Sequence, residues 1–216
     1  MPPVLTLYED ILGSGVVLEL PPLARMIFIV HGSVTIADRL LSDGEAWNGQ
    51  GELTMRAGDA GATCWRWDLA TDDAADRVIG GVRSRTKLSA SLATLPQGDL
   101  LLRGDSVAFP PGGCAYAHRH HGPGIRCLIE GGVRIDTHGT STSYGPGGAW
   151  YESGPEPVFA QAAGDRATRF IRMMILPRAL VGKSSIQYLD PQDSNRPKSQ
   201  TYKVFADAPI AFRACP

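Results

Sequence analysis

The chain has 216 residues, of which 43% are hydrophobic, and its formal net charge is −1. This balance leaves no basic surplus for binding nucleic acid and no cluster of Lys or Arg for a membrane surface. The 25 glycines and 16 prolines lie between many short apolar runs. This pattern favours a turn-rich β protein over a helical bundle.

The four cysteines form no Cys-x-x-Cys pair, so they do not predict a structural zinc site. No apolar run reaches the length of a transmembrane helix, and the acidic N-terminal segment does not resemble a secretory signal. We therefore expect a soluble, cytoplasmic protein with reduced cysteines, mostly buried as small apolar side chains. They are Cys64, Cys114, Cys127 and Cys215.

The first half of the chain contains several strand-like segments. Residues 4–7 and 16–20 are apolar and flank a Gly-Ser-Gly turn, and residues 26–36 resemble a hairpin that turns near Gly32. Residues 125–135 show the same pattern as residues 26–36, which is a weak internal repeat and predicts two similar halves. The corresponding positions are Gly32 with Gly131, Val34 with Val133, and Ile36 with Ile135.

The second half is expected to begin near residues 80–81. Its predicted strands cover residues 87–95, 100–103, 106–109 and 170–176. From residue 181 onward the chain is polar and interrupted by prolines. Its scattered apolar residues predict a tail that docks on its own domain or on a second subunit.

Three of the five histidines lie together, at His118, His120 and His121. Residues two apart on a strand point to the same face, so His118 and His120 place two imidazoles side by side. The turn at residues 122–124 is predicted to end this strand, and the apolar run 127–129 is predicted to be its hairpin partner. This arrangement indicates a site for a metal ion or a small-molecule ligand.

The spacing of Gly112, His118 and His120, followed by a glycine at position 131 or 132, resembles the first motif of the cupin superfamily. The resemblance implies an all-β fold of two jelly-roll barrels. The first barrel, residues 1–80, would be degenerate and is assigned no metal. Residues 81–180 would form the barrel that carries the site, and residues 181–216 a docking tail. Cupin barrels often pair edge to edge, so the resemblance also implies a homodimer.

The usual metal ligands of this family are only partly present. The glutamate of the first motif would fall at Gly124 or Ile125. The proline and histidine of the second motif would fall at Ser153 and Val158. The resemblance therefore supplies two of the four usual ligands.

A third protein ligand would complete a catalytic metal site. Glu152 is the preferred candidate because it lies on the strand that normally delivers the last cupin ligand; the alternatives are His121, Glu130 and Tyr151. Two imidazoles and a carboxylate could bind Fe, Mn, Ni, Cu or Zn and would suit an oxygenase or an isomerase. The predicted catalytic and metal-binding residues are His118, His120 and Glu152.

The alternative is a metal-free barrel that binds or senses a small organic molecule. Ile125 and Val158 would then be apolar side chains near the site. His118 and His120 would act as hydrogen-bond partners or as a general base.

Three further residues are candidates for a substrate pocket. Arg126 would hold a carboxylate if it faced inward, but its alternation with Ile125 favours an outward orientation. Trp150 and Tyr151 would form an aromatic wall of the pocket or part of the barrel core.

Overall fold

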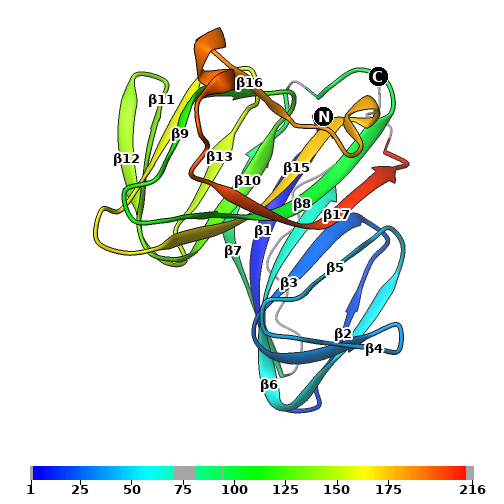
Figure 1. Cartoon of the computed structure of the whole chain (residues 1–216). Coiled ribbons are helices and arrows are strands. Elements are labelled where there is room, and N and C mark those ends of the chain that lie inside the picture. The colour runs from blue at the N-terminus through cyan, green and yellow to red at the C-terminus, as the bar shows by residue number, and fades with distance from the viewer. Residues whose placement is uncertain (1, 71–80, 94, 213–216) are drawn as a thin grey trace. The chain divides into compact units, whose positions relative to one another are not determined.

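The computed structural model describes residues 2–70, 81–93 and 95–212. Antiparallel strands make up most of these residues (Figure 1), so the predicted all-β fold class is confirmed. The chain divides into two compact units, one of Met1–Ala93 with Phe212–Pro216 and one of Thr94–Ala211.

The boundary between the units lies later than the sequence predicted. Strand β7 (Val82–Ser91) pairs along its length with β1 (Val4–Leu12). The backbone hydrogen bonds of β7 therefore belong to the first sheet. The boundary consequently falls at residues 93–94 rather than 80–81.

Seven strands form one antiparallel sheet in the described part of the first unit. Five of them follow the order β4-β3-β6-β1-β7, while β2 pairs with β6 and β5 with β3 beside this path. The two longest strands, β3 and β6, change partners along their length: β3 pairs with β4 and β5, and β6 with β1 and β2. The sheet thereby encloses a core built from β1, β2, β3, β4, β6 and β7. The remaining bounds are β2 (Val17–Leu20), β3 (Ala24–Ile36), β4 (Arg39–Ser42), β5 (Ala46–Gly49) and β6 (Leu53–Ala70).

Two glycines give the internal repeat a structural counterpart. Gly32 and Gly131 both have a φ of +83°. A Cβ would lie 2.2 Å from the carbonyl oxygen of Gly61 in the first case and 2.3 Å from that of Ala167 in the second. The predicted hairpin turn at Gly32 is wrong, because β3 continues through this glycine with register shifts on either side of it. The positive φ produces a bulge instead of a reversal.

The second unit contains two five-stranded antiparallel sheets. One has the order β13-β10-β15-β8-β17 and the other β12-β11-β14-β9-β16. The strands of the first are β8 (Leu100–Phe109), β10 (Gly124–Glu130), β13 (Ala149–Glu152), β15 (Thr168–Pro177) and β17 (Thr201–Ile210). Those of the second are β9 (Cys114–His120), β11 (Val133–Thr137), β12 (Thr140–Tyr144), β14 (Val158–Ala162) and β16 (Ile186–Tyr188).

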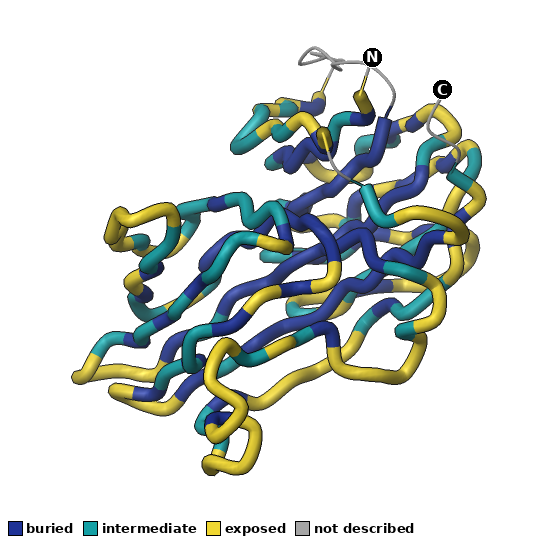
Figure 2. Tube along the Cα trace, turned by 90° about the horizontal axis from the view of Figure 1, so that it is seen from above, coloured by how far each residue is buried: buried dark blue, intermediate teal, exposed yellow. Residues whose placement is uncertain are grey.

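Both sheets of the second unit contribute to one apolar core. Leu128 and Phe170 come from one sheet, and Val133, Val158 and Ala160 come from the other. Figure 2 shows that residues along the strands are largely buried, whereas exposed residues gather at the turns. This layout is typical of a jelly-roll sandwich.

The histidine strand and the strand after it do not form the predicted hairpin. β9 and β10 belong to different sheets. At Gly122, an added Cβ would lie 2.0 Å from the carbonyl oxygen of Ile175, so the crossing between the sheets needs a glycine there. The crossing places the inward side chains of β10 opposite those of β9.

Residues 181–211, the part of the predicted docking tail that lies in the second unit, are not a separate tail. β17 pairs with β8, and β16 pairs with β9, so each extends one sheet of the second unit. The docking predicted for this segment therefore takes the form of backbone hydrogen bonding within its own unit.

Helical structure in the described residues is confined to two 3₁₀ turns, Arg178–Leu180 and Pro191–Asn195. No helix there is long and apolar enough to cross a membrane. Cys64 and Cys127 are buried, as predicted, whereas Cys114 is half-buried; all three are free thiols. Cys215 lies outside the described residues.

We predict that Gly131→Ala lowers the free energy of unfolding by about 3 kcal/mol, because it combines an unfavourable φ with a backbone clash. Gly139→Ala is the matched control, because Gly139 also has a positive φ, of +70°, but no atom lies within 4 Å of its added Cβ. The control should cost only about 1 kcal/mol. Urea unfolding measures both values, and equal losses would contradict a role for the close approach to Ala167.

Candidate functional site

A bulge in β9 directs the histidine pair into the core. Val158 pairs with His118, whereas Ala160 pairs with Ala115, so β9 contains one extra residue between these two positions. Without it, simple alternation from the buried Ala115 would turn His118 and His120 away from the core. Instead both histidines are only 5% exposed.

The two imidazoles belong to one chain of hydrogen bonds. The carbonyl oxygen of Tyr116 lies 2.6 Å from His118 Nδ1, which must donate because a carbonyl only accepts. His118 Nε2 is then free to accept from His120 Nε2, 3.2 Å away. His120 Nδ1 lies 3.3 Å from Ser185 Oγ and accepts from that hydroxyl. Both rings are therefore fully partnered as neutral imidazoles.

Burial keeps both imidazoles neutral. Removal from water lowers the pKa of His118, an effect that Glu152 opposes. Removal from water also lowers the pKa of His120 well below 6.5, and the nearby Arg126 and Arg172 lower it further. Neutral imidazoles can bind metal ions or act as hydrogen-bond partners.

The outward orientation expected for Arg126 is wrong. Arg126 is 1% exposed, and its Nη2 lies 2.7 Å from Glu152 Oε2. Its Nη1 donates to the carbonyl oxygen of Gly124 at 2.6 Å. Burial lowers the pKa of Arg126 to about 10, with Glu152 opposing this effect, so the side chain remains charged at neutral pH. The inward face of β10 therefore presents a cation beside the histidines.

A second buried ion pair lies next to the first. Arg172 on β15 is opposite Arg126 in the register of the sheet. Its Nε and Nη2 atoms donate to the two carboxylate oxygens of Asp105 on β8, at 2.6 and 3.0 Å. Burial lowers the pKa of Arg172, but the attraction of Asp105 outweighs this effect and the pKa is raised. Four neighbouring strands thus carry a charge row of Glu152, Arg126, Arg172 and Asp105.

Glu152 lies close to the histidine pair, as its position on the strand suggested. Its Oε2 is 3.5 Å from His120 Nε2, and its Oε1 accepts a hydrogen bond from the indole of Trp150 at 2.9 Å. Trp150 stacks on Tyr144 and meets Phe170 edge-on, so most of its ring belongs to the core.

Not all of the predicted pocket residues share this face. Val158 is directly opposite His118 in the register and belongs to the apolar core. Ile125 alternates with Arg126, and Tyr151 alternates with Trp150 and Glu152, so Ile125 and Tyr151 lie on the other face of their sheet. The structure therefore does not bring these two residues to the histidines.

The remaining candidates for a third ligand lie elsewhere. His121 is exposed, next to the buried His120, and Glu130 pairs with Arg169 at 2.8 Å on the surface. His120 and His121 both line a cavity of about 410 Å³, together with Arg119, Ser153 and Gln187.

The donor set does not fit a complete metal centre. The two histidine Nε2 atoms converge, but the carboxylate that would be the third ligand is held in an ion pair by Arg126, in which its Oε2 atom accepts no hydrogen bond. No group of three or more His, Cys, Asp or Glu in the described residues is arranged to hold a metal ion. A divalent ion would add charge beside two buried guanidinium groups, which is electrostatically unfavourable.

Sequence reasoning missed Ser185, Tyr116, Arg172 and Asp105. Arg172 carried a detectable signal, because it is a single charge within the apolar run 170–176, and such a charge needs a buried partner. Asp105 fell in a predicted break between two strands, whereas β8 continues through it.

We predict that the stability of the protein falls as the pH drops below 6.5, the ordinary histidine pKa. The unfolded chain binds protons there, whereas folded His118 and His120, with lowered pKa values, do not. The urea midpoint should therefore decrease between about pH 7 and pH 5, and a His118→Gln/His120→Gln variant should show a smaller decrease. The matched control replaces His31 and His138, whose side chains are 79% and 65% exposed. An unchanged pH dependence in the first variant would refute this prediction.

Neither the protein-family models nor the curated protein sequences contain a match to this chain. Among the solved structures that resemble it are the following three. The oxalate decarboxylase of Lactobacillus farciminis, as its formate complex, gives a TM-score of 0.64 at 13% identity, over 89% of this chain and 82% of that one. A Bacillus subtilis oxalate decarboxylase with Mn(II) centres gives a TM-score of 0.56 at 14% identity, over 78% of this chain and 68% of that one. A salicylate 1,2-dioxygenase variant from Pseudoaminobacter salicylatoxidans gives a TM-score of 0.55 at 12% identity, over 78% of this chain and 70% of that one. This similarity concerns the fold, and it shows that the chain has the cupin fold that its sequence resembles.

Proposed function

We propose that the second unit binds a small organic molecule beside His118 and His120, and that this pair works without a resident metal. The observation that carries this proposal is the ion pair between Arg126 and Glu152. It occupies the carboxylate that a metal would need as its third protein ligand. This is the metal-free alternative weighed from the sequence.

The histidines would act as hydrogen-bond partners of the bound molecule. Their lowered pKa values make them weak bases, so at neutral pH they would remove a proton from a bound molecule poorly. His120 Nε2 carries a proton that faces His118 Nε2. A ligand hydroxyl inserted between them would replace that hydrogen bond with two of its own.

A metal-dependent oxygenase or isomerase is the second candidate. It is favoured by the 3.2 Å separation of the two Nε2 atoms, because two ligands about 2.1 Å from one metal ion lie roughly this far apart. Each Nδ1 also has a hydrogen-bond partner, as metal-bound histidines usually do. Two of the similar structures are an oxalate decarboxylase with Mn(II) centres and a salicylate 1,2-dioxygenase. This candidate requires Glu152 to leave Arg126.

We predict that Arg126→Met creates a metal site by releasing Glu152. After incubation with Fe, Mn, Ni, Cu or Zn and dialysis, wild-type protein should retain far less than one equivalent, and Arg126→Met about one. The variant should also lose about 3 kcal/mol of stability, since it leaves a buried charge unpaired. Elemental analysis and urea unfolding measure the two effects.

Arg126→Met/Glu152→Gln is the matched control, because it removes both charges and should neither bind metal nor be strongly destabilised. Wild-type protein that retains one equivalent, and loses it on His118→Gln/His120→Gln substitution, would favour the metal-dependent enzyme instead.

The homodimer and the cytoplasmic location stay predictions, to be tested by sedimentation and by cell fractionation.

A further inference from the structure

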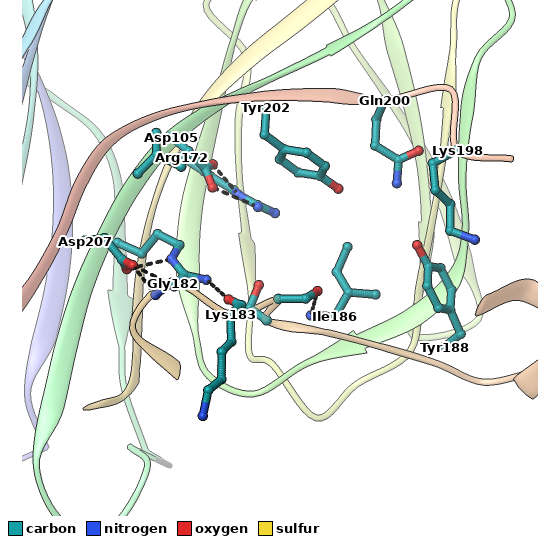
Figure 3. Close-up of a pocket in the computed structure, with 14 residues that line it drawn as sticks. Asp105, Arg172, Gly182, Lys183, Ile186, Tyr188, Lys198, Gln200, Tyr202 and Asp207 are labelled. Atoms are coloured by element: carbon teal, nitrogen blue, oxygen red, sulfur yellow. Dashed lines mark hydrogen bonds and ion pairs between the residues drawn. The ribbon is translucent and has the colours of Figure 1, made fainter. Parts of the chain in front are cut away.

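A cavity of about 460 Å³ lies in the second unit between β17 and the segment 182–188 (Figure 3). Its volume is suitable for a small organic ligand. Tyr202 and Gln200 point into it from one side, and Ile186 and Tyr188 from the other (Figure 3). None of these residues was singled out as a site residue from the sequence.

The cavity has surplus positive charge. Both of its carboxylates are already paired: Asp105 binds Arg172, and Asp207 binds Arg103 at 2.8 and 3.1 Å. Lys198 in contrast donates to the carbonyl oxygens of Asp193 and Arg196, the latter at 2.8 Å. No ion pair joins it to a carboxylate among the described residues. An anionic group on a ligand would supply that missing charge.

Gln200 provides an independent indication of a ligand. It is 6% exposed, and its Oε1 has no hydrogen-bond partner, although the side chain also interacts with Tyr188. A buried acceptor without a donor is costly, and most such atoms in proteins are satisfied. A ligand with a hydroxyl or amine donor would satisfy it.

The walls between these polar groups are aromatic and aliphatic. Lys198 Nζ lies 4.4 Å from the centre of the Tyr188 ring, and the Arg172 guanidinium lies 5.6 Å from that of Tyr202. Ile186 and Val204 add apolar surface. A planar apolar body would fit between the two tyrosines.

The cavity adjoins the histidine pair. Ser185 lines it and also contacts His120 Nδ1 at 3.3 Å. The ring of Tyr188 lies 6.3 Å from that of His118. A molecule in the cavity is therefore separated from the imidazoles by single side chains.

We infer that this cavity binds a small organic acid that carries a hydrogen-bond donor on a planar apolar body. Its carboxylate lies at Lys198, its donor reaches Gln200 Oε1, and its body lies between Tyr188 and Tyr202. The inference rests on the proposed function in one respect, that the second unit binds a small molecule.

Calorimetric titration with 4-hydroxybenzoate, in buffer that contains EDTA, tests this inference. Benzoate lacks the donor and 4-hydroxybenzamide lacks the charge, so each should bind more weakly, by about tenfold. Lys198→Met should weaken binding of 4-hydroxybenzoate by about tenfold or more. Gln200→Leu should remove the preference for 4-hydroxybenzoate over benzoate.

Lys183→Met is the matched control, because Lys183 also lines the cavity but directs its amino group away from Gln200, Tyr188 and Tyr202 (Figure 3). The affinity of this variant for 4-hydroxybenzoate should stay within about twofold of that of wild-type protein. Lys198→Gln repeats the test if the methionine variant unfolds at a lower temperature.

Absence of binding to wild-type protein at millimolar 4-hydroxybenzoate would overturn the inference. Equal losses in Lys198→Met and Lys183→Met would do so as well, because they would indicate unspecific attraction to positive charge. EDTA is present throughout, so the titration does not depend on whether the histidines hold a metal. A failure of the metal-free proposal would show in elemental analysis and leave these affinities unchanged.

Discussion

The ion pair between Arg126 and Glu152 places opposite charges in the middle of an apolar sandwich. Either charge alone would be expensive to bury, so each requires the other in place. This requirement fixes β10 against β13 and directs a guanidinium toward the histidines. It also determines the chemistry of the site, because Glu152, the carboxylate that lies 3.5 Å from His120, is already paired with a cation. The chemistry open to His118 and His120 therefore depends on a contact that neither of them makes.

Much of the fold was accessible from the sequence. Turn residues between short apolar runs indicated an all-β chain, and the repeat around Gly32 and Gly131 pointed to two related halves. Local pattern could not assign strands to sheets, because β9 and β10 are adjacent in the chain yet belong to different sheets. For the same reason the strand at residues 82–91 was assigned to the wrong half, since its partner, β1, lies at least 70 residues earlier in the sequence, as the pair Leu12 and Val82 shows.

The site was predicted in part. The spacing of His118 and His120 correctly placed both imidazoles on one face, and Glu152 does lie beside them. The orientation of Arg126 was missed because alternation was counted from Ile125, which was assumed to face inward. The bulge in β9 has no sequence signature of its own; it appears only in the pairing with β14. Inward and outward positions are thus decided by tertiary pairing, which a one-dimensional pattern does not contain.

The pairing of β17 with β8 has a consequence for the order in which the site assembles. Arg103 and Asp207, which join these strands, are 104 residues apart. Contacts so distant in sequence form late, because a long loop must close first. During synthesis the histidines and the charge row emerge from the ribosome well before Gln200 and Tyr202. The nascent unit would thus carry its buried charges in a sandwich that is still open along one edge. It would most need protection from aggregation at this stage, before β17 pairs with β8.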